Sequence, residues 1–508
     1  MPLSDSKEIK GIVIAGGGTA GWMTAALFAT HLPRERYTVR LIESEEIGTI
    51  GVGESTIPPF LGLIRNLGIN EQDFIAQCQG TFKLGIQFRD WKQKGESYFH
   101  PFGQIGANID GVDFYQAWLK GKLNGHTSAL QDFAPASVMA ANGRFMLPQK
   151  APRSPIATAN YAVHIEARLV AQYLRRHAEA HGTVRSEGMI AAVNLREEDG
   201  HIRSLTLKSG EEVAGDLFID CTGFRALLIG QALGVGYTSW VDELFCDRAI
   251  AVQTENIAEP HPYTLSEAQD FGWRWRIPLQ SRAGNGYVYS SQYISDEDAT
   301  KVLLSKVEGR VLGKPMVVPF TTGIRKEIWH KNCLALGLAS GFIEPLESTA
   351  IHLVYRTLDF FFRFFPDTGF DPALMREFNR RITEDYVEVK DFIVLHYCLT
   401  QRDDTPFWAR CKTQDISENL RRRIDVFKAS GSLLETGPEE LFRAPSWYSV
   451  LDGMGVMPRR GNLLADRLEI GGLMKLLDEV KPPLERFVAT LPGHGEFLKS
   501  FCPAPELV

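Results

Sequence analysis

The sequence has few cysteines, and none of them is placed to hold a metal. Its 508 residues include 7 cysteines and 12 histidines. The cysteines are scattered and never spaced as C-x-x-C, and the histidines form no H-x-H or H-E-x-x-H pair. These absences argue against a disulfide framework and against a zinc or iron–sulfur site. We therefore expect no metal, and we interpret each cysteine as a small buried hydrophobe.

Basic character and long apolar runs are lacking too. The formal net charge of -7 offers no basic surface for nucleic acid. No apolar run approaches the roughly 20 residues that a transmembrane helix needs, and the N-terminus lacks the apolar segment of a secretory signal. The expectation is a cytoplasmic protein that binds neither membranes nor nucleic acid. Its length suits two or three domains, or one elaborated domain.

A glycine-rich turn near the N-terminus is the clearest motif. The apolar run at 12–15 predicts a buried strand, and residues 22–29 predict a helix of small side chains. The G-x-G-x-x-G sequence between them is typical of a turn that binds a dinucleotide pyrophosphate at a helix N-terminus. The residues of this turn that we assign to cofactor binding are Gly16, Gly18, Thr19, Ala20 and Gly21. A glycine turn with only a structural role is the alternative.

Four further segments are predicted to reach the same cofactor. A strand over 37–42 ends at an acid that suits a ribose, a glycine-rich loop over 48–59 can lie against a flat ring, and strands near 217–220 and 334–336 each lead into small residues. The loop over 48–59 also fits a plain surface turn. The cofactor residues assigned from these segments are Glu43, Val52, Gly53, Glu54 and Gly337.

One lysine lies in an unusually apolar setting. Lys83 is surrounded by apolar and aromatic residues in the segment 81–88. True burial would lower its pKa and make the amine a better nucleophile, whereas a lysine that snorkels to solvent is the alternative. Nearby, His100 and Phe102 can line a pocket for a planar ligand. A core histidine is equally compatible with this pattern.

The segment 253–320 is rich in predicted strands, with Gly284-Asn285-Gly286 interpreted as a turn. Within it, the W-x-W-x-I-P sequence predicts a strand whose alternate residues share one face. That face would present a wall of indole rings, or else the edge of an ordinary β-core. The wall residues are Trp273, Trp275, Ile277 and Pro278.

A predicted strand at 334–336 is followed by a loop that opens a helix near residue 350. The amides of Thr349 and its neighbours could bind an anion at that helix start. Beyond about residue 350 the chain reads as mostly helical and rich in aromatic residues. With no internal repeat or low-complexity linker, the parts are expected to form one compact unit.

These motifs together resemble the flavin-dependent tryptophan halogenase family. The resemblance is carried by the turn at 16–21, the lysine in Phe82-Lys83-Leu84-Gly85, W-x-W-x-I-P, and P-L-E-S-T at 345–349, in matching order from about residue 8 to at least 460. It implies an α/β, Rossmann-like FAD-binding fold of the flavin monooxygenase type with a fused, mainly helical C-terminal region. Residues 1–350 would form the FAD-binding region with β-rich insertions, and 351–508 would complete the substrate pocket.

The resemblance also implies a reaction in two places. A separate NADH-dependent flavin reductase supplies reduced FAD, which reacts with dioxygen to give a flavin hydroperoxide. Chloride or bromide attacks this species, and the resulting hypohalous acid travels through the protein to a small aromatic substrate. The tryptophans of the wall keep that substrate away from the flavin. Relatives often form homodimers, which leaves a homodimer open.

Site residues carry over from the family position by position. Lys83 matches the catalytic lysine, which either forms a haloamine or holds hypohalous acid by a hydrogen bond. Glu347 matches the glutamate that activates the halogenating species or assists loss of the ring proton. The halide residues are Ser348, Thr349 and Ala350. Ala350 departs from the usual glycine, and its methyl group would alter the halide cavity.

Further departures concern the substrate. His100 and Phe102 match one side of the aromatic lining, and Phe442 and Trp447 are assigned to the other. Where the family places a glutamate that binds the ammonium of tryptophan, this sequence has Gly437. We therefore expect halogenation of indole or a substituted indole, with free tryptophan a poor substrate. A flavin-dependent aromatic hydroxylase is the main alternative, and a non-catalytic flavin or prenyl-chain binding protein is a more distant one.

Overall fold

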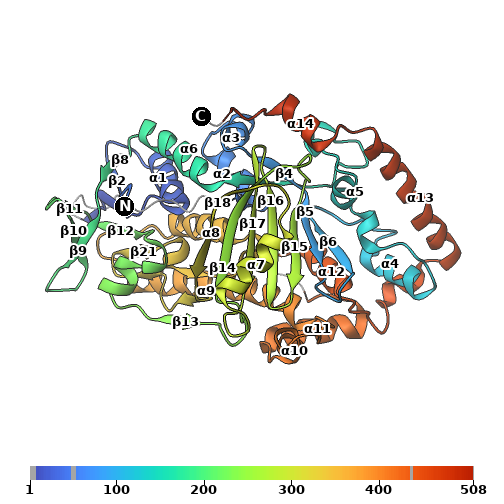
Figure 1. Ribbon diagram of the computed structural model, residues 1–508. Helices are drawn as coiled ribbons and strands as arrows, with labels where there is room; N and C mark the ends of the chain where they lie inside the picture. Colours follow the sequence, from blue (N-terminus) through green and yellow to red (C-terminus); the bar gives the residue numbers. More distant parts are fainter. Residues whose placement is uncertain (1–6, 47–52, 435–436, 438, 507–508) are drawn as a thin grey trace.

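A six-stranded sheet lies toward one end of the molecule (Figure 1). The computed structural model describes residues 7–46, 53–434, 437 and 439–506. The strand order is β20-β21-β12-β1-β2-β8, and all neighbours except β20 and β21 run parallel. The predicted strand–turn–helix–strand unit is confirmed. Its elements are β1 (Gly11–Ala15), α1 (Thr19–His31) and β2 (Thr38–Glu43), and the other strands are β8 (Val184–Glu187), β12 (Leu217–Asp220), β20 (Trp329–His330) and β21 (Cys333–Ala335).

A seven-stranded sheet lies at the centre of the molecule (Figure 1). Its order is β18-β14-β17-β16-β15-β5-β6, and only β15 and β5 are parallel neighbours. Strands from distant parts of the chain therefore share one sheet. Their bounds are β5 (Gly85–Arg89), β6 (Ser97–Pro101), β14 (Arg248–Glu255), β15 (Thr264–Gln269), β16 (Gly272–Pro278), β17 (Arg282–Tyr289) and β18 (Val311–Pro319).

The predicted turn at Gly284-Asn285-Gly286 is wrong. These residues lie inside β17, where they pair with β14 on one side and β16 on the other. A Cβ atom at Gly286 would come within 2.0 Å of the Trp275 ring. The glycine therefore makes room for an indole ring on the sheet and does not mark a chain reversal.

A small sheet of order β3-β7-β4 lies against the seven-stranded sheet, where β3 contacts β16 and β17. It consists of β3 (Gly53–Ser55), β7 (Ala162–Glu166) and β4 (Thr81–Lys83), so the predicted loop over 48–59 contains a strand. The helix expected from Ile165 begins two residues later as α6 (Ala167–Ala180), because Ile165 pairs with Glu54 in this sheet. Glu166 instead caps the helix by accepting a hydrogen bond from the backbone N–H of Leu169.

A fourth group of strands lies beyond the six-stranded sheet, at the left edge of Figure 1. It is a three-stranded antiparallel sheet of order β11-β10-β9. The strands expected near 190–193 and 202–207 are thereby confirmed. The bounds are β9 (Ile190–Leu195), β10 (Ile202–Leu207) and β11 (Glu212–Ala214), and the remaining short strands are β13 (Tyr237–Ser239), β19 (Gly323–Arg325) and β22 (Gly341–Phe342).

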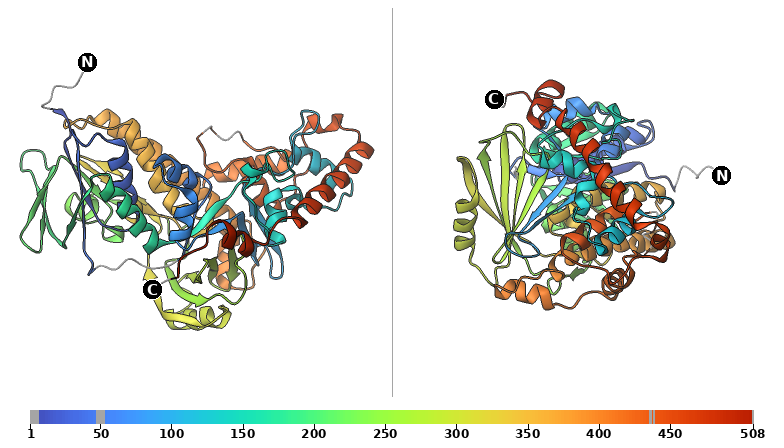
Figure 2. Two further views of the ribbon diagram at one scale, coloured as in Figure 1. Left: turned by 90° about the horizontal axis from the view of Figure 1, so that it is seen from above. Right: turned by 90° about the vertical axis from the view of Figure 1, so that its right-hand side faces the viewer.

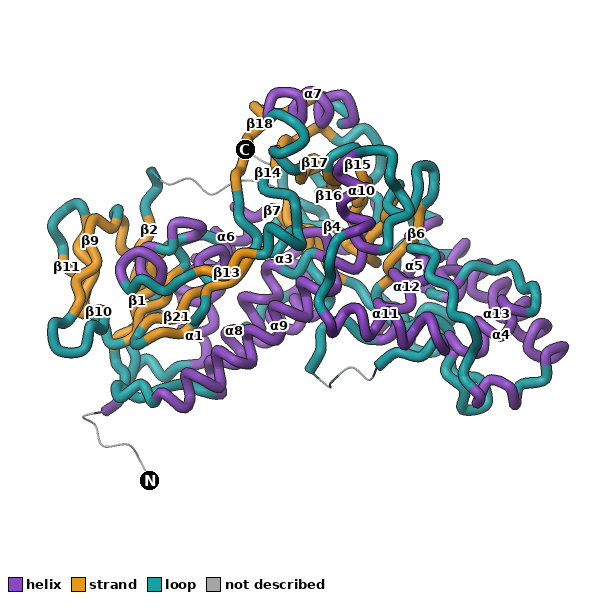
Figure 3. The backbone as a smooth tube through the Cα atoms, turned by 90° about the horizontal axis from the view of Figure 1, so that it is seen from below, coloured by secondary structure: helices purple, strands orange, loops and turns teal. Residues whose placement is uncertain are grey.

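The chain is helical from residue 350 onward, as expected. The first two helices of this part, α8 and α9, run side by side (Figure 3). In Figure 2 the region of α4 and α13 lies at the opposite end of the molecule from the six-stranded sheet. The helices are α8 (Ala350–Arg363), α9 (Pro372–Cys398), α10 (Pro406–Thr413), α11 (Glu418–Ser430), α12 (Ala444–Gly453), α13 (Ile470–Ala489) and α14 (His494–Phe501), and earlier ones are α2 (Pro59–Asn66), α3 (Glu71–Gln77), α4 (Phe114–Leu123), α5 (Pro135–Ala141) and α7 (Asp296–Lys306).

Within the described ranges, none of the helices combines the length and apolar character needed to cross a membrane. The same residues contain no group of three histidine, cysteine or acidic side chains arranged to hold a metal ion. All seven cysteines are free thiols.

Candidate active site

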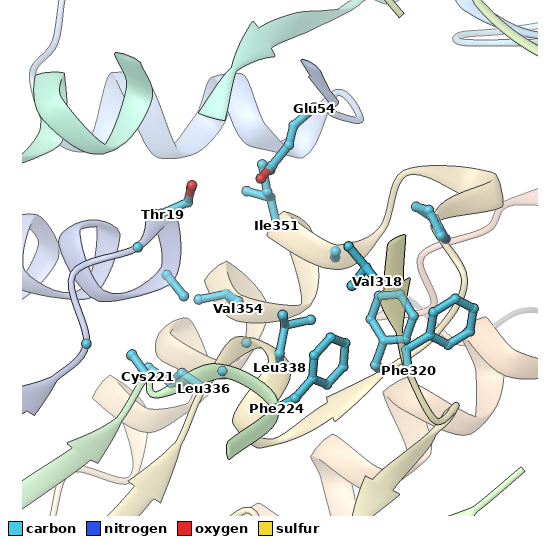
Figure 4. A pocket seen from close by; sticks show the side chains of 18 of the residues that line it. Thr19, Glu54, Cys221, Phe224, Val318, Phe320, Leu336, Leu338, Ile351 and Val354 are labelled. Carbon is cyan, nitrogen blue, oxygen red and sulfur yellow. The ribbon is translucent and has the colours of Figure 1, made fainter. Parts of the chain in front are cut away.

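A cavity of about 570 Å³ lies between the two large sheets and the start of α8. Figure 4 shows its walls: Thr19 and Cys221 come from the six-stranded side, Val318 from β18, and Ile351 from α8. The predicted residues that line this cavity are Gly16, Gly18, Thr19, Ala20, Glu43, Gly53, Glu54, Trp273, Trp275, Ile277, Gly337, Ser348 and Ala350. Thus segments separated by more than 300 residues in the sequence meet around one cavity.

The glycine turn has the geometry of a phosphate cradle. Gly16 has a φ of +108°, and a Cβ atom there would come within 2.3 Å of the Cys221 carbonyl oxygen. A Cβ at Gly21 would come within 1.9 Å of the Gly16 carbonyl oxygen, so Gly21, which lies outside the cavity lining, allows α1 to pack on the turn. At Gly18 the space within 4 Å is open. The start of α1 therefore faces the cavity without side-chain caps and fits a pyrophosphate such as that of FAD.

Glu43 lies at the end of β2 and is held from two sides. Its carboxylate accepts hydrogen bonds from Arg185 Nε and, at 3.1 Å, from Trp22 Nε1. A Cβ at Gly17 would come within 1.7 Å of the Glu43 carboxylate, so only glycine fits beside it. Because a carboxylate has about four acceptor positions, Glu43 can still accept from ribose hydroxyls.

The W-x-W-x-I-P strand faces the cavity with the predicted alternation. Trp273, Trp275 and Ile277 line the cavity, while the carbonyl of Pro278 accepts a hydrogen bond from Thr81 at 2.7 Å outside it. Glu54 points into the same cavity from β3 (Figure 4). Burial and the nearby Glu166 raise the pKa of Glu54 to about 7. The cofactor residue predicted at Val52 lies outside the described residues.

Lys83 ends β4 and is completely buried. Its Nζ donates hydrogen bonds of 3.0 Å to the Thr56 carbonyl and to Ser348 Oγ, and lies 5.0 Å from the centre of the Phe102 ring. Burial lowers the pKa of Lys83 to about 7, although the charge of Glu347 opposes this shift. The alternative of a snorkelling lysine is therefore wrong.

Glu347 is buried between two imidazole rings. His100 Nδ1 lies 2.9 Å from its Oε2, and His396 Nε2 lies 3.0 Å from its Oε1. Burial by itself would raise the pKa of Glu347, but His100 and His396 together lower it to about 2. The carboxylate is therefore ionised at neutral pH, close to the only lysine that contacts the same turn in the described part of the chain.

Sequence reasoning missed His396, which lies on α9 far from the P-L-E-S-T turn. Its Nδ1 is 2.9 Å from the Phe392 carbonyl, so each ring nitrogen faces a group that only accepts hydrogen bonds. His396 therefore lies between the helix backbone and the carboxylate of Glu347. No sequence pattern distinguished His396 from an ordinary core histidine, because a histidine on an apolar helix face more often belongs to the core.

The turn at 345–349 connects the cavity with the buried lysine. Ser348 has a φ of +61°, lines the cavity, and also accepts the hydrogen bond from Lys83. Thr349 is buried and occupies the N-cap of α8, and Ala350 is the first residue of that helix and is exposed toward the cavity. The start of α8, whose first amides have no partner within the helix, thus lies at the cavity edge at the position predicted for halide.

The predicted substrate residues belong to one buried ring cluster. His100 and Phe102 have ring centres 6.4 Å apart, and Phe442 stacks on Phe392 at 3.8 Å. Phe392, a second residue of α9 that the sequence did not reveal, also contacts His100 at 5.9 Å and Trp447 at 5.1 Å. The structure therefore brings His100, Phe442 and Trp447 around Phe392, and Phe102 lies next to them through its contact with His100.

Comparison with known proteins identifies the family. The family model for tryptophan halogenase matches residues 11–469. The chain belongs to the tryptophan halogenase family. Tryptophan 6-halogenase ThaL of Streptomyces albogriseolus is 32% identical over 97% of this chain and 98% of its own. Among solved structures, the flavin-dependent halogenase Xcc4156 from Xanthomonas campestris is 43% identical, with a TM-score of 0.94 and coverage of 99% of this chain and 100% of its own.

A second flavin-dependent halogenase, BrvH from Brevundimonas sp. BAL3, is 40% identical, with a TM-score of 0.94 and coverage of 98% of this chain and 99% of its own. These matches show that the protein is an FADH2-dependent halogenase with the FAD-binding Rossmann-like fold expected from the sequence. As a member of this family it uses a halide, chloride or bromide, and reduced FAD from a partner flavin reductase, and it acts on a small aromatic substrate.

Proposed function

We propose that this halogenase acts on indole or a substituted indole in preference to free tryptophan. We assign Gly437 to the position of the family's ammonium-binding glutamate, and a glycine has no side chain to form an ion pair. The identity to Xcc4156 and BrvH is higher than to ThaL, whose name specifies tryptophan. The protein then selects a flat aromatic ring and not an amino acid.

His100 supports recognition of a ring that carries an N–H group. Its Nδ1 faces the carboxylate of Glu347 and must hold a proton to donate. Its Nε2 has no hydrogen-bond partner among the described residues. In a neutral imidazole this second nitrogen is an acceptor, which suits the N–H of an indole.

The single observation that carries the mechanism is the double contact of Ser348, which joins the cavity to Lys83. When bound, reduced FAD would supply two of the four electrons that reduce dioxygen, and the halide would supply the other two and so become oxidised to hypohalous acid. The turn 348–350 and the start of α8 hold the halide, and the wall of Trp273 and Trp275 separates it from the ring substrate. Oxidised halogen passes along Ser348 to Lys83 Nζ, which presents it to the ring, and Glu347 accepts the ring proton.

The test compares substrates under one set of conditions. The protein, FAD, a flavin reductase with NADH, oxygen and either bromide or chloride are incubated with indole or with tryptophan, and products are identified by mass spectrometry. Loss of a buried partner for an ammonium costs several kcal/mol, so we expect kcat/KM for indole to exceed that for tryptophan by about 100-fold. A preference for tryptophan would contradict the proposal, and hydroxylated products without halogen would favour the hydroxylase alternative.

The pH profile is expected to report on Lys83. Because the pKa of Lys83 is lowered to about 7, the neutral amine predominates above this pH and the ammonium below it. We expect the rate under single-turnover conditions to rise between about pH 6 and pH 8, since only the neutral amine has a lone pair to accept halogen. A rate that falls through this range would instead support an ammonium that holds hypohalous acid by a hydrogen bond.

Three expectations from the sequence stay predictions: the division of the chain at residue 350, the homodimer and the cytoplasmic location. The cavity takes residues from both sides of position 350, including Ile351 and Val354 of α8. We therefore propose that the two predicted regions act as one functional unit.

A further inference from the structure

Glu344 is a completely buried carboxyl group at the start of the P-L-E-S-T turn. Its Oε2 accepts two hydrogen bonds, from Trp273 Nε1 at 2.9 Å and from the Tyr397 hydroxyl at 2.6 Å. Its Oε1 has no partner among the described residues. One carboxyl oxygen thus accepts two hydrogen bonds, and the other accepts none from the described residues.

No cationic group of the described residues is paired with this carboxyl. The groups that face it are Trp273 on β16, Tyr397 on α9, and two thiols, Cys246 before β14 and Cys411 on α10. The Cys246 sulfur lies 3.9 Å from the Tyr397 hydroxyl. Burial raises the pKa of Glu344 to about 7, and it raises the pKa of both thiols well above their usual range. The surroundings therefore favour the neutral acid below about pH 7.

The two donors connect Glu344 to both halves of the active site. Trp273 belongs to the cavity wall, and Tyr397 follows His396, the imidazole that contacts Glu347. Glu344 itself begins the turn that carries Glu347 and Ser348. A single buried side chain thus joins the cofactor wall, the catalytic turn and α9.

We propose that Glu344 is a positioning residue that holds Trp273 and Tyr397 in one arrangement with the catalytic turn, so that oxidised halogen made in the cavity reaches Lys83 and does not escape. This inference rests on the roles proposed above for the tryptophan wall and Lys83. It assigns no contact with substrate to Glu344.

The neutral acid and glutamine are nearly equivalent at this position. In the E344Q variant the amide oxygen would accept both hydrogen bonds, and the NH2 group would occupy the place of the unpartnered oxygen. Leucine has a similar volume but accepts nothing, which leaves the Trp273 N–H and the Tyr397 hydroxyl buried without partners. The two substitutions therefore separate the hydrogen bonds from the volume.

The first experiment measures halogenated indole formed per dioxygen consumed, together with released hydrogen peroxide. We expect this ratio to stay within about twofold of wild type in E344Q and to fall about tenfold in E344L. The reason is that a displacement of catalytic groups by about 1 Å lowers function even when all of these groups are still present. The missing electrons should appear as peroxide. Wild-type coupling in E344L, or equal losses in E344Q and E344L, would overturn the proposal.

The second experiment does not depend on turnover. Ionisation of Glu344 beside Trp273 should give a tryptophan absorbance difference across the pKa of about 7 that is absent from E344Q and W273F. W408F is the matched control and should keep the difference, because Trp408 Nε1 donates to the Gln269 carbonyl, which does not titrate. Persistence of the difference in E344Q would overturn the assignment even if E344L fails to fold. If wild type does not halogenate indole, the proposed function fails, whereas this titration still decides the state of Glu344.

Discussion

Replacing Lys83 with methionine should lower the rate of halogenation by about a thousandfold, within the range of a lost group that transfers or holds a reacting species. Methionine fills the same buried space but cannot accept halogen or donate to Ser348. The measurement is product formation from indole by mass spectrometry with saturating FAD, reductase, oxygen and bromide. K83R, which keeps a permanent charge, should be equally inactive.

A loss of folding can be separated from this effect. Lys83 does not line the cavity, so the FAD affinity of K83M should match wild type. The folded state lowers the pKa of Lys83 to about 7, so the unfolded chain binds a proton at this lysine more readily than the folded chain does. The resulting loss of folding stability is complete below about pH 7 and disappears above the unfolded pKa of about 10.4. K83M should therefore have a higher free energy of unfolding at neutral pH than wild type. A variant that retained halogenation above about a tenth of wild type would contradict the role of Lys83.

Replacing Glu347 with glutamine should reduce halogenation by about 100- to 1000-fold. Glutamine has one acceptor oxygen, so its NH2 group would face one of the two imidazoles in place of a carboxylate oxygen. The ring proton would lose its acceptor, and His100 and His396 would lose their shared anion. Single-turnover product formation measures this loss, with D452N as a matched control because Asp452 is another largely buried acid, on α12, outside the site. Equal activity of E347Q and D452N would exclude the proposed role.

Acid stability gives an independent readout of Glu347. Its pKa is lowered to about 2 in the folded protein, compared with about 4.3 in an unfolded chain. The stabilisation is therefore fully present above about pH 4.3 and is lost as the pH falls toward about 2. In urea unfolding between about pH 3 and pH 7, wild type should lose more stability on acidification than E347Q. Parallel curves for the two proteins would contradict the depressed pKa.

The features that the sequence predicted best are those set by neighbouring residues in short local motifs. The small residues at 16–21 determine a turn because only glycine tolerates the φ of +108° at Gly16 and the short approach at Gly21. The period of two in W-x-W-x-I-P determines that Trp273, Trp275 and Ile277 share a face. Lys83 and Glu347 were assigned by resemblance. In the structure Lys83 donates a hydrogen bond to Ser348, and Glu347 directly precedes Ser348 in the same turn.

Other features had no local pattern to reveal them. Gly284-Asn285-Gly286 has the composition of a turn, but two neighbouring strands and the ring of Trp275 keep it extended. His396 and Phe392 lie on a long helix whose apolar spacing is that of any core helix. Their position against Glu347 and the ring cluster follows from how α9 packs.

By itself, the sequence determined the dinucleotide turn and the shared face of the tryptophan wall, because these depend on backbone conformation and on the spacing of neighbouring residues, and the family chemistry came from the resemblance of its motifs. Only the tertiary structure decided that Lys83 is fully buried, that Glu347 lies between two imidazoles, and that Ser348 connects the cavity with the lysine. Burial and charge depend on side chains from distant segments. Those side chains shift the pKa of each buried polar group and form its hydrogen bonds only after the chain has folded.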